Sequence, residues 1–354
     1  MAIRVASRAA DSIHLQQPLA SFLRCMLRPD SVGLTAHTAF SSPPSTTHKN
    51  PRRTKMIKII QFFTEKFYFR GLPNILFRLR RFLIETSGIV RDPNGIHFRI
   101  DRNNYFQHNI TYGYYEAEVR WTLKLLLKPG DTFLDIGANI GYLSAVASEC
   151  VGETGHVLSF EPNPEVFPLL VDNSKLGPYR NIFPVNFAAS EKSGTANLFC
   201  GFETALSTLQ EKTGLLRIKC AVEVATVSID DWLRTQVFDI GKIKLVKIDT
   251  EGHEYKVLKG LEKLIRSRTA AFLIENNPIA SKTIGVEFDM ICKDFFFVNN
   301  YSVYWIGSKG SGGLFHRRKL RFTPVMLQNA TGFNGRSGDY LCLADSSILA
   351  KGLV

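Results

Sequence analysis

The chain has 354 residues, of which 45% are hydrophobic, and its formal net charge is +12. This composition excludes a collagen-like, disulfide-scaffold or wholly disordered protein and is compatible with one to three domains around a substantial core. The longest apolar runs, such as TAAFLI, are well short of the roughly 18 residues that a membrane span requires. The six cysteines form no CxxC pair and no histidine stands at ligand spacing from them. The sequence therefore predicts no zinc or metal–thiolate site and favours a reducing compartment.

The positive charge is concentrated in two segments. Residues 1–55 contain eight Lys and Arg against two Asp, and residues 308–325 contain five Lys and Arg without an acid. These segments carry +6 and +5 of the total +12, so the remainder of the chain is near neutral. This distribution weakens a general electrostatic argument for nucleic-acid binding.

Residues 1–55 differ from the rest of the chain in composition. They are rich in Ser, Thr, Ala and Arg and poor in acids, as organellar transit peptides are. An alternative is an upstream extension from a mis-assigned start codon, with Met56 opening the protein. We expect a disordered or spurious extension outside the fold, and a cytoplasmic location unless the segment is a transit peptide.

Residues 56–110 predict N-terminal helices followed by a hairpin. Apolar residues recur at helical spacing from Met56 to Phe67 and from Ile75 to Leu83, and Asn94-Gly95 supplies a hairpin turn. The helices in 56–85 are basic, so they are compatible with peripheral contact with an anionic membrane. Packing of their apolar stripes on the domain itself is the simpler interpretation.

Residues 111–346 alternate between predicted strands and helices, with a basic insertion at 308–338. This alternation predicts an α/β fold with a doubly wound, mainly parallel sheet. Its ligand is expected at the carboxyl ends of the strands. The predicted strands are 132–136, 156–161, 181–189, 243–249, 270–276, 301–306 and 339–344, and the main helices are 116–127, 142–150, 165–177, 254–265 and 284–295.

The stretch FLDIGANIGYLS has the form of a nucleotide-cofactor loop between a strand and a helix. Gly137 and Gly141 allow a ligand to approach the backbone, but Asn139 stands where a dinucleotide enzyme has glycine. Asp135 at the strand end would repel a pyrophosphate and suits a cationic cofactor such as S-adenosylmethionine. A purely structural turn is the alternative.

Acids also follow the next strand and a later one. Glu161 ends the segment SFEPNP and could accept hydrogen bonds from ribose hydroxyls, although a helix-capping role is an alternative. The segment KLVKIDTEGHE leads a buried strand into Asp249, Glu251, His253 and Glu254. We expect Glu254 to stabilise the start of the following helix and the other three to take functional roles.

These segments, in this order, resemble the FkbM-type methyltransferase family over roughly residues 110–278. The resemblance implies a seven-stranded, Rossmann-like methyltransferase sheet, S-adenosylmethionine as cofactor and O-methylation of a hydroxyl on a small molecule, sugar or glycolipid. It also implies a set of cofactor-binding residues: Glu116, Asp135, Gly137, Asn139, Gly141, Glu161, Asn163 and Ala188. Of these, the four from Asp135 to Gly141 would line the methionine end and Glu161 the ribose, residues 186–190 would flank the adenine, and Glu116 would also approach the cofactor.

Methyl transfer to a hydroxyl requires alignment of the nucleophile and removal of its proton. We expect Asp249 or His253 to do this, with Glu251 in the same catalytic group, and we expect no metal. A divalent metal held by Asp249 and neighbouring acids, as in some other O-methyltransferases, is the alternative. A nucleic-acid methyltransferase is the rival enzyme, but the position after the fourth parallel strand reads DTEG and not the Asn/Asp-Pro-Pro-aromatic motif. A methyltransferase fold that serves only as a binding module is the non-enzymatic alternative.

Overall fold

The computed structural model describes residues 51–69, 72–83, 88–101, 103–201, 207–211, 218–236, 238–308, 315–317 and 320–347. The chain divides into two units after Lys49, and all of the described residues belong to the second unit. Residues 1–50, on which the expectations of a transit peptide and of an organellar location rest, lie outside the described residues. So do 309–314 and 318–319, which are parts of the basic insertion.

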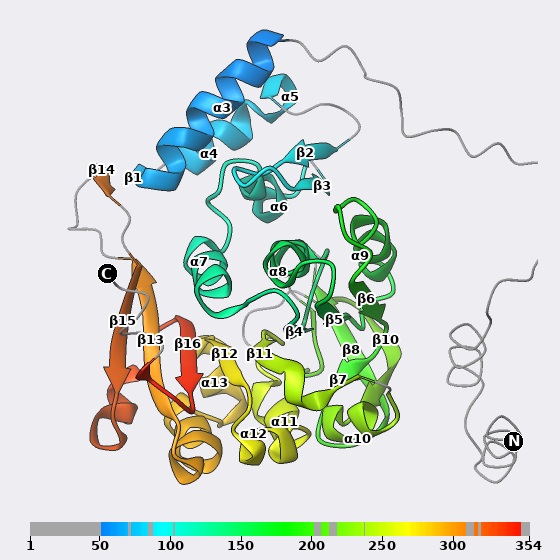
Figure 1. Ribbon diagram of the computed structural model, residues 1–354, viewed down its shortest axis with the longest axis vertical. Coiled ribbons are helices and arrows are strands. Elements are labelled where there is room, and N and C mark those ends of the chain that lie inside the picture. Colours follow the sequence, from blue (N-terminus) through cyan, green and yellow to red (C-terminus); the bar gives the residue numbers. More distant parts are fainter. Residues whose placement is uncertain are drawn as a thin grey trace, which may run out of the picture. The chain divides into compact units, whose positions relative to one another are not determined.

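An eight-stranded sheet forms the centre of the molecule, in the order β15-β13-β16-β12-β11-β4-β5-β6 (Figure 1). Neighbours from β12 to β6 are parallel, whereas β16, β13 and β15 pair antiparallel to their neighbours. The strands are β4 (Thr132–Ile136), β5 (His156–Phe160), β6 (Ile182–Val185), β11 (Ile243–Ile248), β12 (Ala271–Asn276), β13 (Ser302–Ser308), β15 (Leu320–Val325) and β16 (Gly338–Leu343).

The predicted doubly wound α/β fold is confirmed, but the predicted count of seven strands is wrong for this sheet. The additional strand is β15, which arises from the basic insertion and pairs antiparallel with residues 303–308 of β13. The sequence alone predicts no strand in this insertion, because Gly, Ser, Lys and Arg residues dominate its composition. A strand added at the edge of a sheet needs only a partner with free backbone groups, and β13 provides one.

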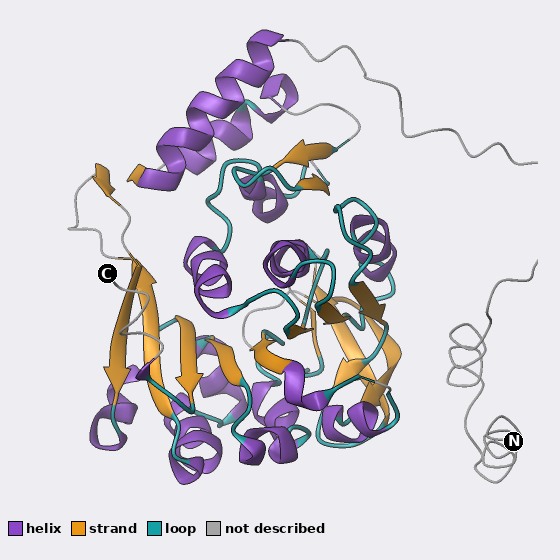
Figure 2. Ribbon diagram, in the orientation of Figure 1, coloured by secondary structure: helices purple, strands orange, loops and turns teal. Residues whose placement is uncertain are grey.

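Helices cover both faces of this sheet (Figures 1 and 2). On one face lie α6 (Tyr105–Ile110), α7 (Ala117–Leu126), α8 (Tyr142–Val151) and α9 (Phe167–Asn173). The other helices after the sheet begins are α10 (Ile229–Arg234), α11 (Glu254–Lys259), α12 (Glu262–Ser267), α13 (Pro278–Ile284) and α14 (Phe288–Ile291), with short helical turns η1 (Ile240–Lys242), η2 (Cys292–Phe296), η3 (Phe297–Asn299) and η4 (Leu327–Phe333).

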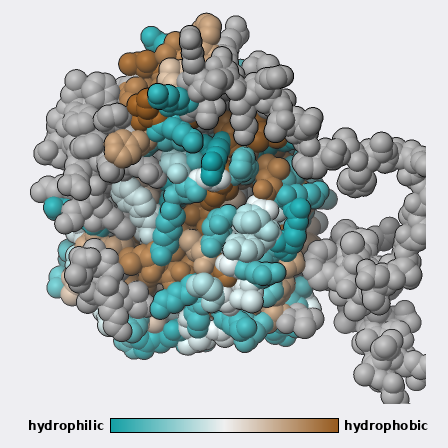
Figure 3. All heavy atoms as spheres, turned by 45° about the horizontal axis from the view of Figure 1, so that its top comes forward, coloured by the Kyte–Doolittle hydropathy of each residue, from teal (hydrophilic) through white to brown (hydrophobic). Residues whose placement is uncertain are grey.

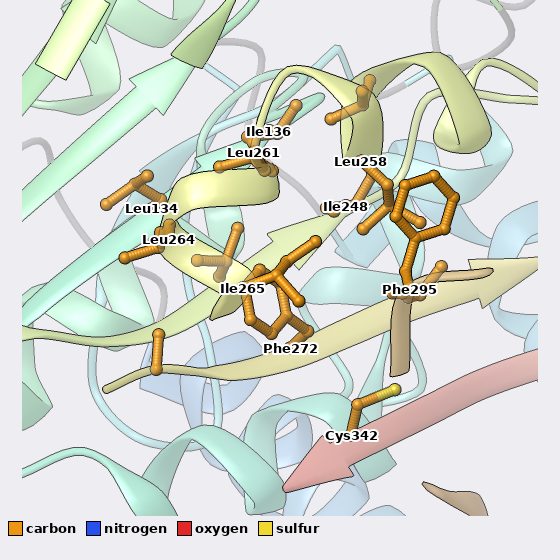
Figure 4. Close-up of a cluster of buried hydrophobic side chains, with 14 of the residues drawn as sticks. Leu134, Ile136, Ile248, Leu258, Leu261, Leu264, Ile265, Phe272, Phe295 and Cys342 are labelled. Atoms are coloured by element: carbon orange, nitrogen blue, oxygen red, sulfur yellow. The ribbon is translucent and has the colours of Figure 1, made fainter. Parts of the chain in front are cut away.

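Strand alternation divides the interior into two hydrophobic cores, one on each face of the sheet. Leu134, Ile248 and Phe272 point to the face covered by α11 and α12, where Leu258 and Leu264 pack against them (Figure 4). The residues that alternate with these on the same strands point to the other face of the sheet, where they pack with α7 and α8 in the second core. Because both faces are buried, the strands are apolar runs without a polar face, which is typical of parallel sheets.

A smaller sheet with the order β7-β10-β8-β9 packs beside the main sheet. It consists of β7 (Ala188–Ala189), β8 (Gly194–Gly201), β9 (Ser207–Thr208) and β10 (Ile218–Val227). The predicted single strand 181–189 is therefore two strands, β6 and β7, in different sheets. Likewise, the predicted helix 254–265 is two helices, α11 and α12, separated at Gly260 and Leu261. A Cβ on Gly260 would lie 2.1 Å from the Ser190 carbonyl oxygen, so no side chain fits at this break.

The N-terminal part of the described chain is helical and ends in the predicted hairpin. The elements are α3 (Pro51–Lys66), β1 (Phe67–Phe69), α4 (Leu72–Arg78), α5 (Arg80–Leu83), β2 (Ile89–Arg91) and β3 (His97–Arg99), and β1 pairs with β14 (Phe315–Arg317). The first helix of the described residues begins at Pro51, inside the segment expected to lie outside the fold. None of the described helices combines the length and the hydropathy needed to cross a membrane.

Candidate active site

Strand register brings three loops together at the carboxyl ends of the parallel strands. Ile136 at the end of β4 is paired with Phe160 of β5 on one side and with Ile248 of β11 on the other. The backbone continues this alignment, because Gly137 N–H donates to the Phe160 carbonyl and Asp249 N–H donates to the Ile136 carbonyl, each at 3.0 Å. The segments that follow β4, β5 and β11 therefore line one cleft.

The loop after β4 can be built only with glycine at its first position. Gly137 has φ +83°, and a Cβ on it would lie 1.8 Å from the Asp249 carbonyl oxygen. Gly141 has the same φ and begins α8, whose first turn faces the cleft. Asn139 lies between them with φ +50°, and its buried Oδ1 atom has no hydrogen-bond partner among the described residues. This loop therefore presents backbone and one free amide oxygen to the cleft.

Asp135 is buried beside this loop and is held by α8. Its carboxylate accepts a hydrogen bond from Ser144 Oγ at 2.5 Å, and Ser144 in turn accepts one from Ser159 Oγ at 2.8 Å. Burial raises the pKa of Asp135 above its usual value, although the Ser144 bond and Lys247 act in the opposite direction. Asp135 lines the cleft, as does Glu116 from the turn before α7.

Glu161 follows β5 and holds two loops by their backbones. One carboxylate oxygen accepts from Asn139 N–H and the other from Asn163 N–H, both at 2.8 Å. A carboxylate has about four acceptor directions, so each oxygen retains one for a ligand. Burial raises the pKa of Glu161 to about 7 despite these two hydrogen bonds.

The other two expected cofactor residues differ in their surroundings. Ala188, at the start of β7, is buried and lines the cleft. Asn163 lies behind the cleft wall, where its side chain bonds Ser207 Oγ at 3.0 Å and accepts from Glu165 N–H at 2.8 Å. Asn163 thus holds the loop after β5 against β9, and the structure gives its side chain no place in the cleft lining.

Lys247 occupies the wall of the cleft two residues before Asp249. Its side chain is only 2% exposed, and its ammonium lies 2.7 Å from the Asp249 carboxylate. Burial alone would lower the pKa of Lys247, but the carboxylates of Asp249 and Glu116 raise it well above its usual value. In turn Lys247 lowers the pKa of Asp249 against the effect of burial. The pair is therefore ionised at neutral pH.

Two further carboxyl groups reach this pair from neighbouring strands. Asp249 continues β11 beside Glu275 of β12, and Glu275 is paired in register with Asp339 of β16. The negative charge of Asp249 and burial raise the pKa of Glu275, and burial and Glu116 raise that of Asp339. Both carboxyls therefore retain their protons to a higher pH than usual.

Glu251 projects from the loop after β11. Carboxylate oxygens of Asp249, Glu251 and Glu275 all lie within 4.8 Å of one another, an arrangement that could hold a cation. Burial and the nearby Asp249 and Glu254 raise the pKa of Glu251 to about 8. Its backbone is left-handed, with φ 52°. The sequence predicted no such group of three, because Glu275 comes from a different strand.

His253 has both ring nitrogens engaged. Gln210 Nε2 donates to Nδ1 at 2.9 Å, so the proton lies on Nε2, which is 3.0 Å from Ser190 Oγ. Burial lowers the pKa of His253 to about 4, and the ring is neutral at neutral pH. His253 lines the cleft, but it has no free nitrogen with which to take a proton from a substrate.

Glu254 stabilises the loop after β11. Its carboxylate accepts hydrogen bonds from Thr250 N–H at 3.0 Å, from Thr250 Oγ1 at 3.1 Å and from Gly252 N–H at 3.1 Å. Three donors on one carboxylate fix the turn that carries Glu251 and place Glu254 at the first turn of α11. This structural role is the one that the sequence predicted.

The cleft as a whole is strongly acidic. Its lining includes six carboxyl groups and one lysine: Glu116, Asp135, Glu161, Asp249, Glu251, Glu275 and Lys247. Three of its residues, Glu116, Asn139 and Glu251, are non-glycine residues with positive φ. Such backbone strain is concentrated at functional sites, where the surrounding structure maintains it. The cleft therefore suits a ligand with positive charge.

Lys247, Glu275 and Asp339 were not predicted from the sequence. The sequence does contain an indication for Lys247, which is a charged residue within the apolar run IKLVKI. Because it is two residues before Asp249, the two side chains are expected on the same face of the strand. A buried strand tolerates a lysine only if acids surround it. Glu275 and Asp339 carry no such signal, because their place depends on the order of strands β11, β12 and β16.

Together the parallel sheet with its antiparallel edge and the acidic cleft beyond the glycine loop define a Rossmann-like methyltransferase domain. Residues 135–302 match the model of the methyltransferase FkbM domain, and the resemblance inferred from the sequence motifs is thereby confirmed. The cofactor of this class is S-adenosylmethionine, as the sequence predicted.

Two curated relatives share part of the chain. Hexuronic acid methyltransferase AglP of Haloferax volcanii is 32% identical over 149 residues, which is 41% of this chain and 57% of that protein. Protein-L-isoaspartate O-methyltransferase of Methanothrix thermoacetophila is 39% identical over 56 residues, or 16% of this chain and 27% of that protein. The chain thus covers only about half, or less, of these relatives.

Among solved structures, the methyltransferase FkbM of Methylobacillus flagellatus is 14% identical, with a TM-score of 0.36. That alignment covers 72% of this chain and 59% of the other.

Proposed function

We propose that this protein is an S-adenosylmethionine-dependent O-methyltransferase whose acceptor is a hydroxyl group of a sugar, glycolipid or other small molecule. The observation that carries the proposal is the acidic cleft at the carboxyl ends of the parallel strands, which is lined by six carboxyl groups and a lysine. The name of the partial relative AglP, a hexuronic acid methyltransferase, supports a sugar acceptor.

The chemistry of the cleft fits this cofactor. S-adenosylmethionine carries a sulfonium and an ammonium group, and when bound it supplies a methyl group activated for in-line displacement. Asp135, Glu116 and the free Oδ1 of Asn139 are acceptors suited to the cationic end. Glu161 retains acceptor directions for ribose hydroxyls, and Ala188 offers an apolar surface to the adenine ring.

The acceptor side of the cleft is formed by the loop after β11. Among its carboxyls, Glu251 has a pKa of about 8, which makes it the strongest base of those whose pKa lies near neutrality. We assign Glu251 as the group that takes the proton from the hydroxyl. Asp249, kept ionised by Lys247, is assigned to hold that hydroxyl by accepting a hydrogen bond.

This assignment changes the role expected for His253. With Nδ1 occupied by Gln210 and the ring neutral, the histidine supports the cleft wall through Ser190 and Gln210. Its removal should affect the shape of the site more than proton transfer.

The acidic wall also favours a neutral acceptor group. A carboxylate acceptor would have to approach ionised Asp249, and the repulsion between like charges in a buried cleft is large. A hydroxyl avoids this cost and can donate a hydrogen bond to Asp249 or Glu251. The methylated product should therefore be an ether.

Calorimetry with S-adenosylmethionine, followed by turnover with labelled cofactor, tests the proposal. Glu251→Gln and Asp249→Asn should bind the cofactor but lose most of the turnover, whereas exposed Glu149→Gln serves as a matched control that retains it. Full turnover in both cleft variants would refute the assignment. Absence of cofactor binding by the folded wild-type chain would instead favour a non-catalytic binding module.

A further inference from the structure

The N-terminal helices expose large apolar side chains on one surface. We call this surface the N-terminal face and define it by six exposed apolar residues of α3, α4, α5 and the turn between α4 and α5, together with three exposed cations. The exposed fractions of the apolar residues range from 44% to 73%. The apolar residues are Met56, Ile59, Phe62, Ile75, Leu79 and Phe82, and the cations are Lys55, Lys58 and Arg78. Figure 3 shows hydrophobic residues gathered at the top of the view, which holds these helices.

Helix α3 is anchored to the domain through the side of the helix that faces away from the N-terminal face. Gln61 Nε2 donates to the carbonyls of Arg91 and Thr111, each at 2.8 Å, and buried Thr64 donates to the Tyr112 carbonyl. At about 100° per residue, Ile59 and Lys55 lie on the far side of the helix from Thr64. The anchored side thus leaves Ile59 50% exposed and Met56 44% exposed.

Helices α4 and α5 repeat this pattern. Leu76 and Leu83 are buried, whereas Ile75, Leu79 and Phe82 follow one another at intervals of four and three residues. This spacing places the three on one stripe of the helical surface. Phe82 is 73% exposed, the highest value among the large apolar residues of the described chain.

The charged residues of this region are almost all positive. Residues 55–83 contain seven Lys and Arg and a single acid, Glu65. A surface that mixes exposed Ile, Leu and Phe with cations matches the interface of an anionic bilayer, where apolar side chains enter the headgroup region and cations contact lipid phosphates.

Other occupants fit this surface less well. In a symmetric dimer, the same cationic patch would face its copy, and the like charges would repel. A nucleic acid would satisfy the cations but leave Ile59, Ile75 and Leu79 in contact with phosphate and water.

The N-terminal face lies next to the active-site cleft through α6. Phe77 of α4 makes edge-to-face contacts with Tyr105 and His108 of α6, at ring-centroid distances of 5.3 and 5.4 Å. On the same short helix, Phe106 and Gln107 line the cleft. One helix therefore connects the exposed apolar surface to the site wall.

We propose that the N-terminal face docks the protein on an anionic lipid bilayer, with Ile59 and Phe82 inserted among the lipids and Lys55 and Lys58 contacting their headgroups. This peripheral contact does not depend on the methyl-transfer activity. If both are true, the cleft lies beside the membrane, where a lipid-linked acceptor would be presented.

The test is vesicle co-sedimentation of the full chain. Wild-type protein should bind vesicles of phosphatidylcholine with phosphatidylglycerol, bind pure phosphatidylcholine vesicles much less, and dissociate with added salt. The double variant Lys55→Gln/Lys58→Gln should bind the anionic vesicles roughly 30-fold more weakly, and Ile59→Ser/Phe82→Ser at least about tenfold more weakly. All four residues are exposed, so circular dichroism should show unchanged folding.

Matched controls come from the other end of the molecule. Val298→Ser removes an apolar side chain that is 67% exposed, and Lys263→Gln removes an exposed cation; both should bind vesicles like the wild type. Equal vesicle binding by all variants would overturn the proposal, because the contact would then lie elsewhere. Dimerisation in ultracentrifugation that Ile59→Ser/Phe82→Ser abolishes would also overturn it, as would binding to single-stranded RNA in preference to anionic vesicles.

Discussion

Cofactor binding to the acidic cleft should release protons. In the free protein, burial raises the pKa of Glu161 to about 7 and burial with neighbouring acids raises that of Glu251 to about 8. A sulfonium in the cleft favours the ionised form of both carboxyls, so their pKa values fall on binding. By linkage, affinity increases as pH rises towards about 8 and is weakest where both carboxyls are protonated.

The magnitude follows from these pKa values. If each carboxyl is ionised in the complex, affinity should rise roughly tenfold per carboxyl between about pH 6 and about pH 7.5. Titration calorimetry in buffers of different ionisation enthalpy measures both the affinity and the number of protons released. S-adenosylhomocysteine, which lacks the sulfonium charge, is the matched ligand and should show a much smaller dependence.

Variants assign the effect to individual groups. At pH 7, Glu251→Gln should remove about 0.9 proton of the release and Glu161→Gln about half a proton, because a group with pKa 7 is half ionised before binding. Both variants should flatten the pH dependence of affinity. An affinity that is independent of pH, or proton uptake on binding, would refute the reasoning from charge. An equal pH dependence for S-adenosylhomocysteine would show that the sulfonium is not the cause.

Four further predictions concern single groups. Gly137→Ala should lower the free energy of unfolding by more than about 2 kcal/mol, because the left-handed backbone and the contact with the Asp249 carbonyl both oppose a Cβ. Gly177→Ala, which has open space around it, should change this free energy by less than about 0.5 kcal/mol. Equal effects of the two substitutions in urea denaturation would contradict the geometry. Lys247→Met should cost about 3–5 kcal/mol near pH 8, and less at low pH where Asp249 can take up a proton, while exposed Lys244→Met should cost little. Glu251→Gln should reduce kcat/KM by about 10²–10⁴-fold and abolish the limb of the pH profile near 8, so an unchanged profile would exclude it as the base. The pKa of His253 is lowered to about 4 in the folded protein, so the unfolded state protonates this ring more readily and stability should fall as the pH drops from about 6.5 towards 4. His253→Gln should remove this part of the acid sensitivity in urea denaturation. If the variant showed the same pH dependence of stability as the wild type, the ring would not be buried as described.

Much of the fold could be predicted from the sequence, because the apolar strands and intervening helices have clear lengths and endings. The glycine loop from Asp135 to Gly141 was recognisable because positive φ and an acid at a strand end are encoded locally. Strand β15 was missed because its residues gain a strand conformation only by pairing with β13, which is a property of the tertiary structure.

The composition of the active site was predicted in part, and for a similar reason. Asp249, Glu251 and His253 follow a single strand, so one short segment placed all three at the sheet edge. Glu275 joins them only because β12 lies beside β11 in register. The engagement of His253 by Gln210 and Ser190 depends on two segments that are distant in the chain, so the sequence could not show that its nitrogens are occupied.

The contact between two of the cysteines also depends on the tertiary structure. They are scattered in the sequence, yet Cys200 of β8 is paired in register with Cys220 of β10. Burial and Cys220 raise the pKa of the Cys200 thiol to about 11, so it stays protonated at neutral pH. Both are free thiols in the structure.

The central claim is that this acidic cleft transfers a methyl group from S-adenosylmethionine to a hydroxyl. The most direct measurement is the incubation of the full chain with methyl-labelled cofactor and a panel of glycans and glycolipids, followed by alkaline treatment of the labelled product. The structure predicts label in an alkali-stable methyl ether, formed by the wild type and by Glu149→Gln but not by Glu251→Gln. Label that alkali releases as a methyl ester, or label that Glu251→Gln transfers as fast as the wild type, would contradict it.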